Sequence, residues 1–183
     1  METLMKKSIV INLFAGPGAG KSTGATYIFS KLKMAGVDAE YVSEFAKDKV
    51  WEENERVFHN QFYITGKQAW KIARCNGKVD VIITDSPILL GAMYCDDNPE
   101  LISGIKYEFK KYSNLNFFIE RVKSYNPNGR NQTFDEAKKI DKETLKFLDS
   151  CNESYAIIDG DQKGYDKAVN LILKAIDQDS KTE

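Results

Sequence analysis

A glycine-rich segment near the N-terminus constrains the fold of this chain more than any other feature. The segment runs from Phe14 to Thr23 and reads Phe-Ala-Gly-Pro-Gly-Ala-Gly-Lys-Ser-Thr. It follows an apolar run, Ile9–Leu13, and precedes a helical pattern, which is the context that a phosphate-binding loop of the form G-x-x-x-x-G-K-[ST] requires. Ala15 replaces the usual first glycine, but three glycines remain in the loop. The pattern therefore predicts a P-loop, and the alternative is a glycine-rich turn that binds nothing.

The residues of this loop have separate roles in holding a nucleotide. A flexible backbone can turn successive N–H groups into one anion-binding concavity, and the following helix points its positive end at the same place. The expected nucleotide-binding residues are Gly16, Gly18, Ala19, Gly20, Lys21, Ser22 and Thr23. Lys21 can reach the β- and γ-phosphates of ATP, and the Ser22 hydroxyl can bind Mg²⁺. ATP and Mg²⁺ are therefore the cofactors that the sequence predicts.

Strand-like runs alternate with helical patterns along the chain, which is typical of a parallel sheet covered by helices. The expected strands are Ser8–Phe14, Ala39–Ser43, Val79–Thr84, Leu115–Ile119 and Tyr155–Ile158. We expect residues 1–183 to form one three-layer α/β/α P-loop NTPase domain with a mainly parallel, five-stranded sheet. The polar segment of about 123–132 is long enough to be a lid. The polar tail, about 178–183, is expected to fray.

Composition excludes several other classes of protein. The chain is 42% apolar and 29% charged, with a formal net charge of −1, so no global field draws it to DNA or membranes. No apolar stretch reaches the roughly 20 residues that a membrane span needs. Cys75, Cys95 and Cys151 are widely spaced and read as reduced cytosolic thiols, and the single His59 argues against a multi-histidine metal centre. We expect a cytoplasmic protein.

Two acidic residues follow predicted strands. Asp85 ends the β-branched run Val81–Thr84, and an acidic residue at the carboxyl end of such a strand commonly serves Mg²⁺ in P-loop proteins. Its alternative is an Asx-turn or cap. Glu44 follows the second predicted strand and could accept a proton from an attacking hydroxyl or grip a ribose. Its alternative is a helix-start acid paired with Lys47 or Lys49.

Two arginines flank the polar segment and are candidates for closing on the transferring group. Arg121 precedes the segment, and Arg130 lies within it beside Gly129. Phosphoryl transfer spreads negative charge over the transferred group, and a guanidinium binds phosphate oxygens bidentately. We expect Lys21, Glu44, Asp85, Arg121 and Arg130 to be the catalytic residues. A solvated charged loop is the alternative for the two arginines.

The segment Asn54–Asn76 has helical periodicity and carries both polar and aromatic side chains. Gln61 and Gln68 are two turns apart and share a face, which suits either a base or sugar pocket or plain solvent. The nearby aromatic residues are Trp51, Phe58, Phe62, Tyr63 and Trp70. We expect these rings in the core rather than as stacking platforms, although any one of them could line an acceptor pocket.

Four segments together carry a family resemblance. Phe14–Thr23, Glu44–Trp51, Thr84–Pro87 and Asn116–Gln132 resemble small phage and bacterial ATP-binding proteins that are related to the nicotinamide riboside kinase domain of NadR. The resemblance runs from about Ser8 to Ile176 and implies a P-loop kinase that uses ATP. Some relatives are proposed to phosphorylate 5-hydroxymethyl-deoxyuridine in phage DNA.

The sequence thus predicts a phosphotransferase that moves the γ-phosphoryl of ATP to a nucleoside- or nucleotide-like small molecule. One alternative is a kinase of a modified base, with DNA as the substrate. Another is an ATP-hydrolysing switch that acts on a partner protein. The sequence names neither the acceptor nor an oligomeric state, and nothing in it points to a membrane.

Overall fold

The computed structural model describes residues 7–95, 98–122 and 133–179. Its centre is a five-stranded sheet in the order β2-β3-β1-β4-β5, and every neighbouring pair of strands is parallel. The strands are β1 (Ile9–Phe14), β2 (Ala39–Val42), β3 (Val81–Thr84), β4 (Ser113–Glu120) and β5 (Ala156–Asp159). The predicted parallel α/β fold is confirmed, and each predicted strand is present within a few residues of its expected ends.

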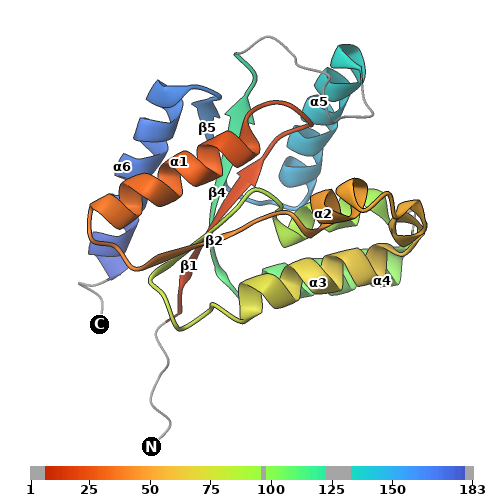
Figure 1. Cartoon of the computed structure of the whole chain (residues 1–183), viewed down its shortest axis with the longest axis horizontal. Coiled ribbons are helices and arrows are strands. Elements are labelled where there is room, and N and C mark those ends of the chain that lie inside the picture. The colour runs from red at the N-terminus through yellow and green to blue at the C-terminus, as the bar shows by residue number, and fades with distance from the viewer. Residues whose placement is uncertain (1–6, 96–97, 123–132, 180–183) are drawn as a thin grey trace, which may run out of the picture.

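Helices cover both faces of the sheet and complete the three layers (Figure 1). They are α1 (Lys21–Met34), α2 (Phe45–Trp51), α3 (Gln61–Ala73), α4 (Pro99–Phe109), α5 (Phe134–Ser150) and α6 (Gln162–Asp179). Alternate residues of β1 point to opposite faces. Ile11 and Leu13 pack with α1 and α6, whereas Val10 and Phe14 pack with residues of α3, α4 and α5. Because β1 is buried on both faces, its sequence is a nearly continuous apolar run.

Two helices begin at residues of types that commonly cap helices. The Asn98 side chain accepts a hydrogen bond from the Leu101 amide at 2.9 Å, and Pro99 takes the first helical position of α4. At α5, Thr133 and Glu136 form the reciprocal capping box. None of the helices that the structure describes is long and apolar enough to cross a membrane.

The long helix expected over Asn54–Asn76 is instead two elements. A 3₁₀ helix, η1 (Glu55–His59), comes first, and α3 starts after Asn60. The Asn60 side chain accepts a hydrogen bond from the Tyr63 amide at 3.0 Å, which caps α3 and ends the preceding turn. The sequence interpretation raised α2 only as the alternative for Glu44, a helix-start acid, and it missed a second 3₁₀ helix, η2 (Ile88–Tyr94).

The expectation that the aromatic residues of this region lie in the core is wrong. Their exposed fractions are 73% for Trp51, 41% for Phe58, 74% for Phe62, 39% for Tyr63 and 67% for Trp70. The buried stripe of α3 is made by Ile64, Thr65, Gln68 and Ile72. Since a helix turns 100° per residue, the rings of α3 fall on its outer side.

Candidate functional site

The glycine-rich loop connects the end of β1 directly to α1, at the point where the strand order changes direction. β1 pairs with β3 on one side and with β4 on the other, so the loop lies at the topological switch point of the sheet. Gly18 and Gly20 adopt the left-handed region, with φ of 76° and 109°. The Gly20 carbonyl accepts a hydrogen bond from the Tyr165 hydroxyl at 3.0 Å, which ties the loop to α6. The conformation predicted for a P-loop is therefore built into the backbone.

Lys21 opens α1 and turns its amine back over the loop. Its Nζ donates to the Ala15 carbonyl at 2.7 Å and to the Gly16 carbonyl at 3.1 Å. Burial lowers the pKa of Lys21, and the negative charges of Glu44, Asp85 and Asp141 oppose that shift. The sheet thus gathers carboxylates from three different elements around the one lysine of the loop.

Asp85 is buried directly after β3, the strand next to β1. One of its carboxylate oxygens accepts the Tyr41 hydroxyl at 2.9 Å, and the other accepts the Glu44 amide at 3.1 Å. Burial and the charge of Asp85 raise the pKa of Tyr41, which keeps that hydroxyl protonated as a donor. Asp85 is therefore held in a fixed orientation by two residues that follow or belong to β2. This fits an acidic residue beside the phosphate loop better than a local Asx-turn.

Glu44 occupies the N-cap position of α2. Within the described part of the chain, its carboxylate accepts no hydrogen bond and forms no ion pair, because Lys49 pairs with Glu52 at 2.6 Å instead. Burial raises the pKa of Glu44, and the charge of Lys21 lowers it. The structure thus shows the helix start but not the pairing with Lys47 or Lys49 that the alternative assumed, and the side chain remains available beside the P-loop.

Gln68 holds this region to the sheet. Its Oε1 accepts the Phe45 amide at 2.9 Å, and its Nε2 donates to the Thr84 hydroxyl at 3.2 Å. Lys71 donates to the Ser43 carbonyl at 2.6 Å. Gln61, its predicted partner on the helix face, donates to Thr65 within the same helix. The polar residues of α3 therefore position the β2–α2 connection on which Glu44 sits.

Arg121 follows β4 and pairs with Asp141 of α5. The Arg121 Nε and Nη2 lie 3.1 and 3.0 Å from one Asp141 oxygen, and the other oxygen accepts the Gly16 amide at 2.6 Å. Asp141 thus links the arginine to the P-loop, and the sequence interpretation missed it. A signal was present: Ala137, Thr144 and Leu148 are the buried stripe of α5, and Asp141 is a carboxylate at the same helical spacing.

Arg130 and the lid expected over 123–132 lie outside the described residues. Their roles remain predictions, as does the fraying of the tail, of which residues 180–183 are also outside. Of the predicted catalytic residues, the structure therefore brings together Lys21, Glu44 and Asp85, and it places Arg121 next to the P-loop through Asp141.

The residues of this site are suited to binding Mg²⁺ together with a nucleoside triphosphate. A P-loop site uses few protein ligands for the metal, mainly the loop Ser or Thr and a nearby Asp, because the phosphates supply others. No group of three or more His, Cys, Asp or Glu residues among the described ones could hold a metal ion alone. Ser22 in the first turn of α1 and the oriented Asp85 are the residues that would serve Mg²⁺ here.

We expect replacement of Asp141 with alanine to destabilise the protein by about 2–4 kcal/mol, because it leaves the guanidinium of a nearly buried arginine and a P-loop amide without this partner. Thermal or urea unfolding of the variant measures this loss. Glu143→Ala is the matched control on the same helix, since its pair with Lys139 is exposed and should contribute less than about 0.5 kcal/mol. Equal stability of the two variants would contradict a structural role for the Asp141 bridge.

Comparison with known proteins gives a family and a distant structural likeness. The solved structure titled "Crystal structure of APE1195" is 19% identical, with a TM-score of 0.46, and the alignment covers 96% of this chain and 98% of that one. No curated protein matches the chain. The family described as "AAA domain" matches residues 10–163, which include the P-loop, both acidic residues and Asp141. The chain belongs to this AAA domain family, a group of P-loop nucleotide-binding proteins.

Proposed function

We propose that the protein is an ATP-dependent phosphotransferase whose acceptor is a small nucleoside- or nucleotide-like molecule. The observation that carries the proposal is the Glu44 carboxylate. It is partly buried beside the P-loop lysine, and no hydrogen bond or ion pair within the described part of the chain engages it. Nucleotide binding alone needs a P-loop and an oriented Asp85. A carboxylate beside them that no described partner engages is what proton removal from an acceptor hydroxyl requires in addition.

In the proposed reaction, the acceptor oxygen forms a bond to the γ-phosphorus of ATP as the bond to the β–γ bridging oxygen breaks. The electron pair of that bond leaves with ADP, and the proton of the acceptor hydroxyl passes to the Glu44 carboxylate. Lys21 and the loop amides hold the phosphates, and Arg121 stabilises charge that develops on the transferring group. Ser22 and Asp85 would hold Mg²⁺, which would neutralise part of the phosphate charge.

Burial raises the pKa of Glu44, which suits a base that must take up a proton during turnover. Tyr94 of η2 lies near Glu44. Partial burial and the negative charge of Glu44 together raise the pKa of Tyr94. The acceptor is therefore proposed to bind between the Glu44 carboxylate and the P-loop, with Tyr94 at its edge.

A transfer screen with γ-labelled ATP tests this proposal. The acceptors are nucleosides, nucleotides, nicotinamide riboside and single- and double-stranded DNA carrying 5-hydroxymethyl-deoxyuridine. We expect label to move to one class of free small molecule. Transfer to DNA alone would favour the modified-base kinase. Release of inorganic phosphate without labelled acceptor, together with nucleotide-dependent assembly, would favour the ATP-hydrolysing switch and overturn the proposal.

A further inference from the structure

The outer side of α3 carries large aromatic rings with exposed surface. Phe62 and Trp70 are about two-thirds or more exposed, and Tyr63 is 39% exposed although its ring also packs edge to face against Phe45, with 5.7 Å between the ring centres. Tyr63 and Trp70 are seven residues apart, which is two turns, or about 10 Å along the axis. We call the outer side of α3 formed by Tyr63, Lys67, Trp70 and Arg74 the α3 face. An exposed tryptophan and tyrosine aligned along one helix mark a surface that has a ligand or partner.

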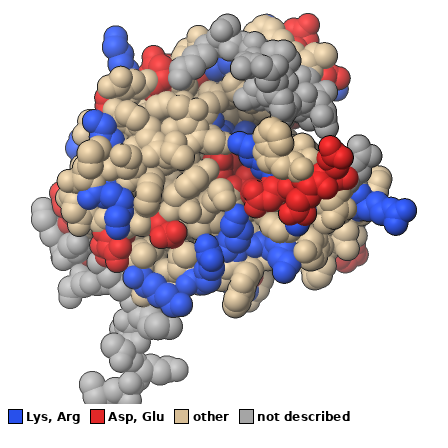
Figure 2. Space-filling view, viewed as in Figure 1, with Lys and Arg blue, Asp and Glu red and all other residues tan. Residues whose placement is uncertain are grey.

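The α3 face is also strongly basic, although the whole chain has a net charge of −1. From Arg56 to Val79 the sequence contains no aspartate or glutamate, and its cations are Arg56, Lys67, Lys71, Arg74 and Lys78. Figure 2 shows Lys and Arg side chains gathered over α3, with acidic side chains grouped above them over α2. Positive charge is thus concentrated on this helix, whereas Glu52 and Glu53 follow α2 and Glu100 and Glu108 lie on α4.

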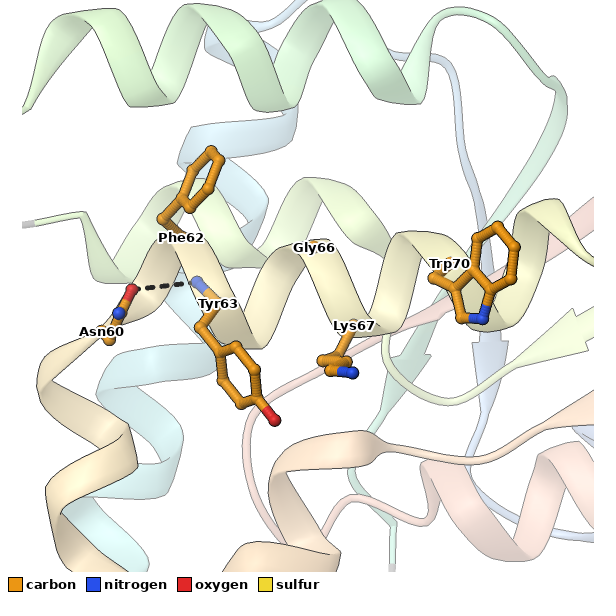
Figure 3. Close-up of a pocket in the computed structure, with 6 residues that line it drawn as sticks. All are labelled: Asn60, Phe62, Tyr63, Gly66, Lys67 and Trp70. Carbon is orange, nitrogen blue, oxygen red and sulfur yellow. Dashed lines mark hydrogen bonds between the residues drawn. The ribbon is translucent and has the colours of Figure 1, made fainter.

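The rings and cations of the α3 face border one shallow groove. Its lining residues are Asn60, Phe62, Tyr63, Gly66, Lys67 and Trp70, and its volume is about 530 Å³. In Figure 3, Tyr63 and Lys67 project together from one side of the helix, Trp70 follows further along, and Phe62 points the other way. The Lys67 Nζ lies 5.5 Å from the centre of the Tyr63 ring. A flat ring that enters this groove therefore meets aromatic faces and an ammonium group at once.

We propose that the α3 face binds a single strand of nucleic acid. Such a strand presents flat bases for Tyr63 and Trp70 and phosphates for Lys67 and Arg74, which is the combination that sequence-tolerant single-strand binders use. An acidic peptide would meet the charge but would not supply a row of rings. A second copy of this chain would set the same cations against one another in a two-fold contact.

The surroundings of the α3 face limit the path of the strand. A second groove, between Phe62 and α4, is lined in part by Glu100 and Glu108. Phosphates are repelled there, so the strand runs along Tyr63 and Trp70 rather than between α3 and α4. Binding on this path involves neither Lys21 nor Glu44, and it is therefore independent of phosphoryl transfer.

Fluorescence anisotropy with a labelled dT oligonucleotide tests the proposal on the full chain. We expect Trp70→Ala to weaken binding about tenfold or more, since stacking on one aromatic ring carries that much affinity. Trp51→Ala is the matched control, because Trp51 is equally exposed at the end of α2 beside acidic residues, and it should bind like the wild type. Lys67→Glu should also weaken binding, whereas Lys174→Glu, the same charge change on α6, should have a much smaller effect.

Two further measurements separate the proposal from its competitors. The logarithm of the binding constant should fall with the logarithm of salt concentration with a slope of about −1.4, as expected for two phosphate contacts of a single strand, at Lys67 and Arg74. The P-loop variant Lys21→Ala should bind the oligonucleotide like the wild type, even if it is inactive. Undetectable binding, or equal binding by Trp70→Ala and Trp51→Ala, would overturn the proposal. A dimer in analytical ultracentrifugation that Trp70→Ala dissociates, without oligonucleotide binding, would overturn it in favour of self-association.

Discussion

Replacement of Lys21 with alanine is expected to lower the rate of phosphoryl transfer by about a thousandfold. The amine already lies over the loop, bonded to the Ala15 and Gly16 carbonyls, and it is the cation that the strand–loop–helix geometry presents to the phosphates. Removal of one preorganised group that stabilises developing charge typically costs a factor of about 10²–10³, and Lys21 also holds the ground-state phosphates. Initial rates of ATP turnover and fluorescent-nucleotide affinity measure the effect.

The control for this prediction lies on the same helix. Lys33→Ala removes an exposed lysine whose only described ion pair, with Asp38 at 3.7 Å, is at the surface. Both variants should keep the far-UV circular dichroism of the wild type, but only Lys21→Ala should lose turnover. Undiminished turnover in Lys21→Ala would exclude the glycine-rich loop as the catalytic site.

Replacement of Glu44 with glutamine is expected to lower turnover by about 10²–10⁴ while leaving ATP affinity nearly unchanged. The substitution keeps the size of the side chain. It also keeps the hydrogen bond that the backbone amide of residue 44 donates to Asp85, so only the basic charge is lost. General-base assistance is typically worth a factor of that size. Loss of ATP affinity with turnover preserved would instead assign Glu44 to the nucleotide or metal site. A small rate effect would indicate a phosphate acceptor, which requires no strong base.

The raised pKa of Glu44 predicts how Glu44→Gln changes stability and how the wild-type rate depends on pH. Burial raises this pKa above its value in the unfolded chain, so the folded protein holds the proton more tightly. The resulting contribution to stability is fully present below the unfolded pKa and is lost as pH rises through the folded pKa. At neutral pH, Glu44→Gln should therefore be at least as stable as the wild type, which separates a catalytic loss from unfolding. The wild-type rate should fall as pH drops through the raised pKa, because the base becomes protonated.

The fold was predictable because its signals are local and agree with one another. β1 is buried on both faces and reads as an apolar run, and the capping box at Thr133 starts α5 where the pattern indicates. The break at Asn60 was not predictable from periodicity, since a capping side chain interrupted an otherwise continuous helical pattern. The outward rings of α3 were also misplaced, because an aromatic residue at helical spacing fits a core stripe or an exposed one until the packing of Gln68 and Ile72 fixes the helix rotation.

The candidate site was predictable where it depends on parallel topology. Carboxyl ends of parallel strands meet at one edge of the sheet, so Asp85 and Glu44 were expected near the loop that follows β1. The roles of Tyr41 and Asp141 were not predicted from the sequence, because they depend on tertiary contacts. Tyr41 is an ordinary strand residue until its hydroxyl meets Asp85. Asp141 is an ordinary helical carboxylate until Gly16 and Arg121 come from distant parts of the chain to share it.

The fate of the γ-phosphoryl group tests the central claim most directly. Phosphorus NMR of a reaction with ATP, Mg²⁺ and the acceptor class found in the transfer screen follows ADP, free phosphate and phosphorylated acceptor together. We predict that the wild-type protein forms ADP and phosphorylated acceptor in equal amounts, and that Glu44→Gln slows both products equally. Formation of ADP and free phosphate at a rate that neither the acceptor nor Glu44→Gln changes would contradict the account.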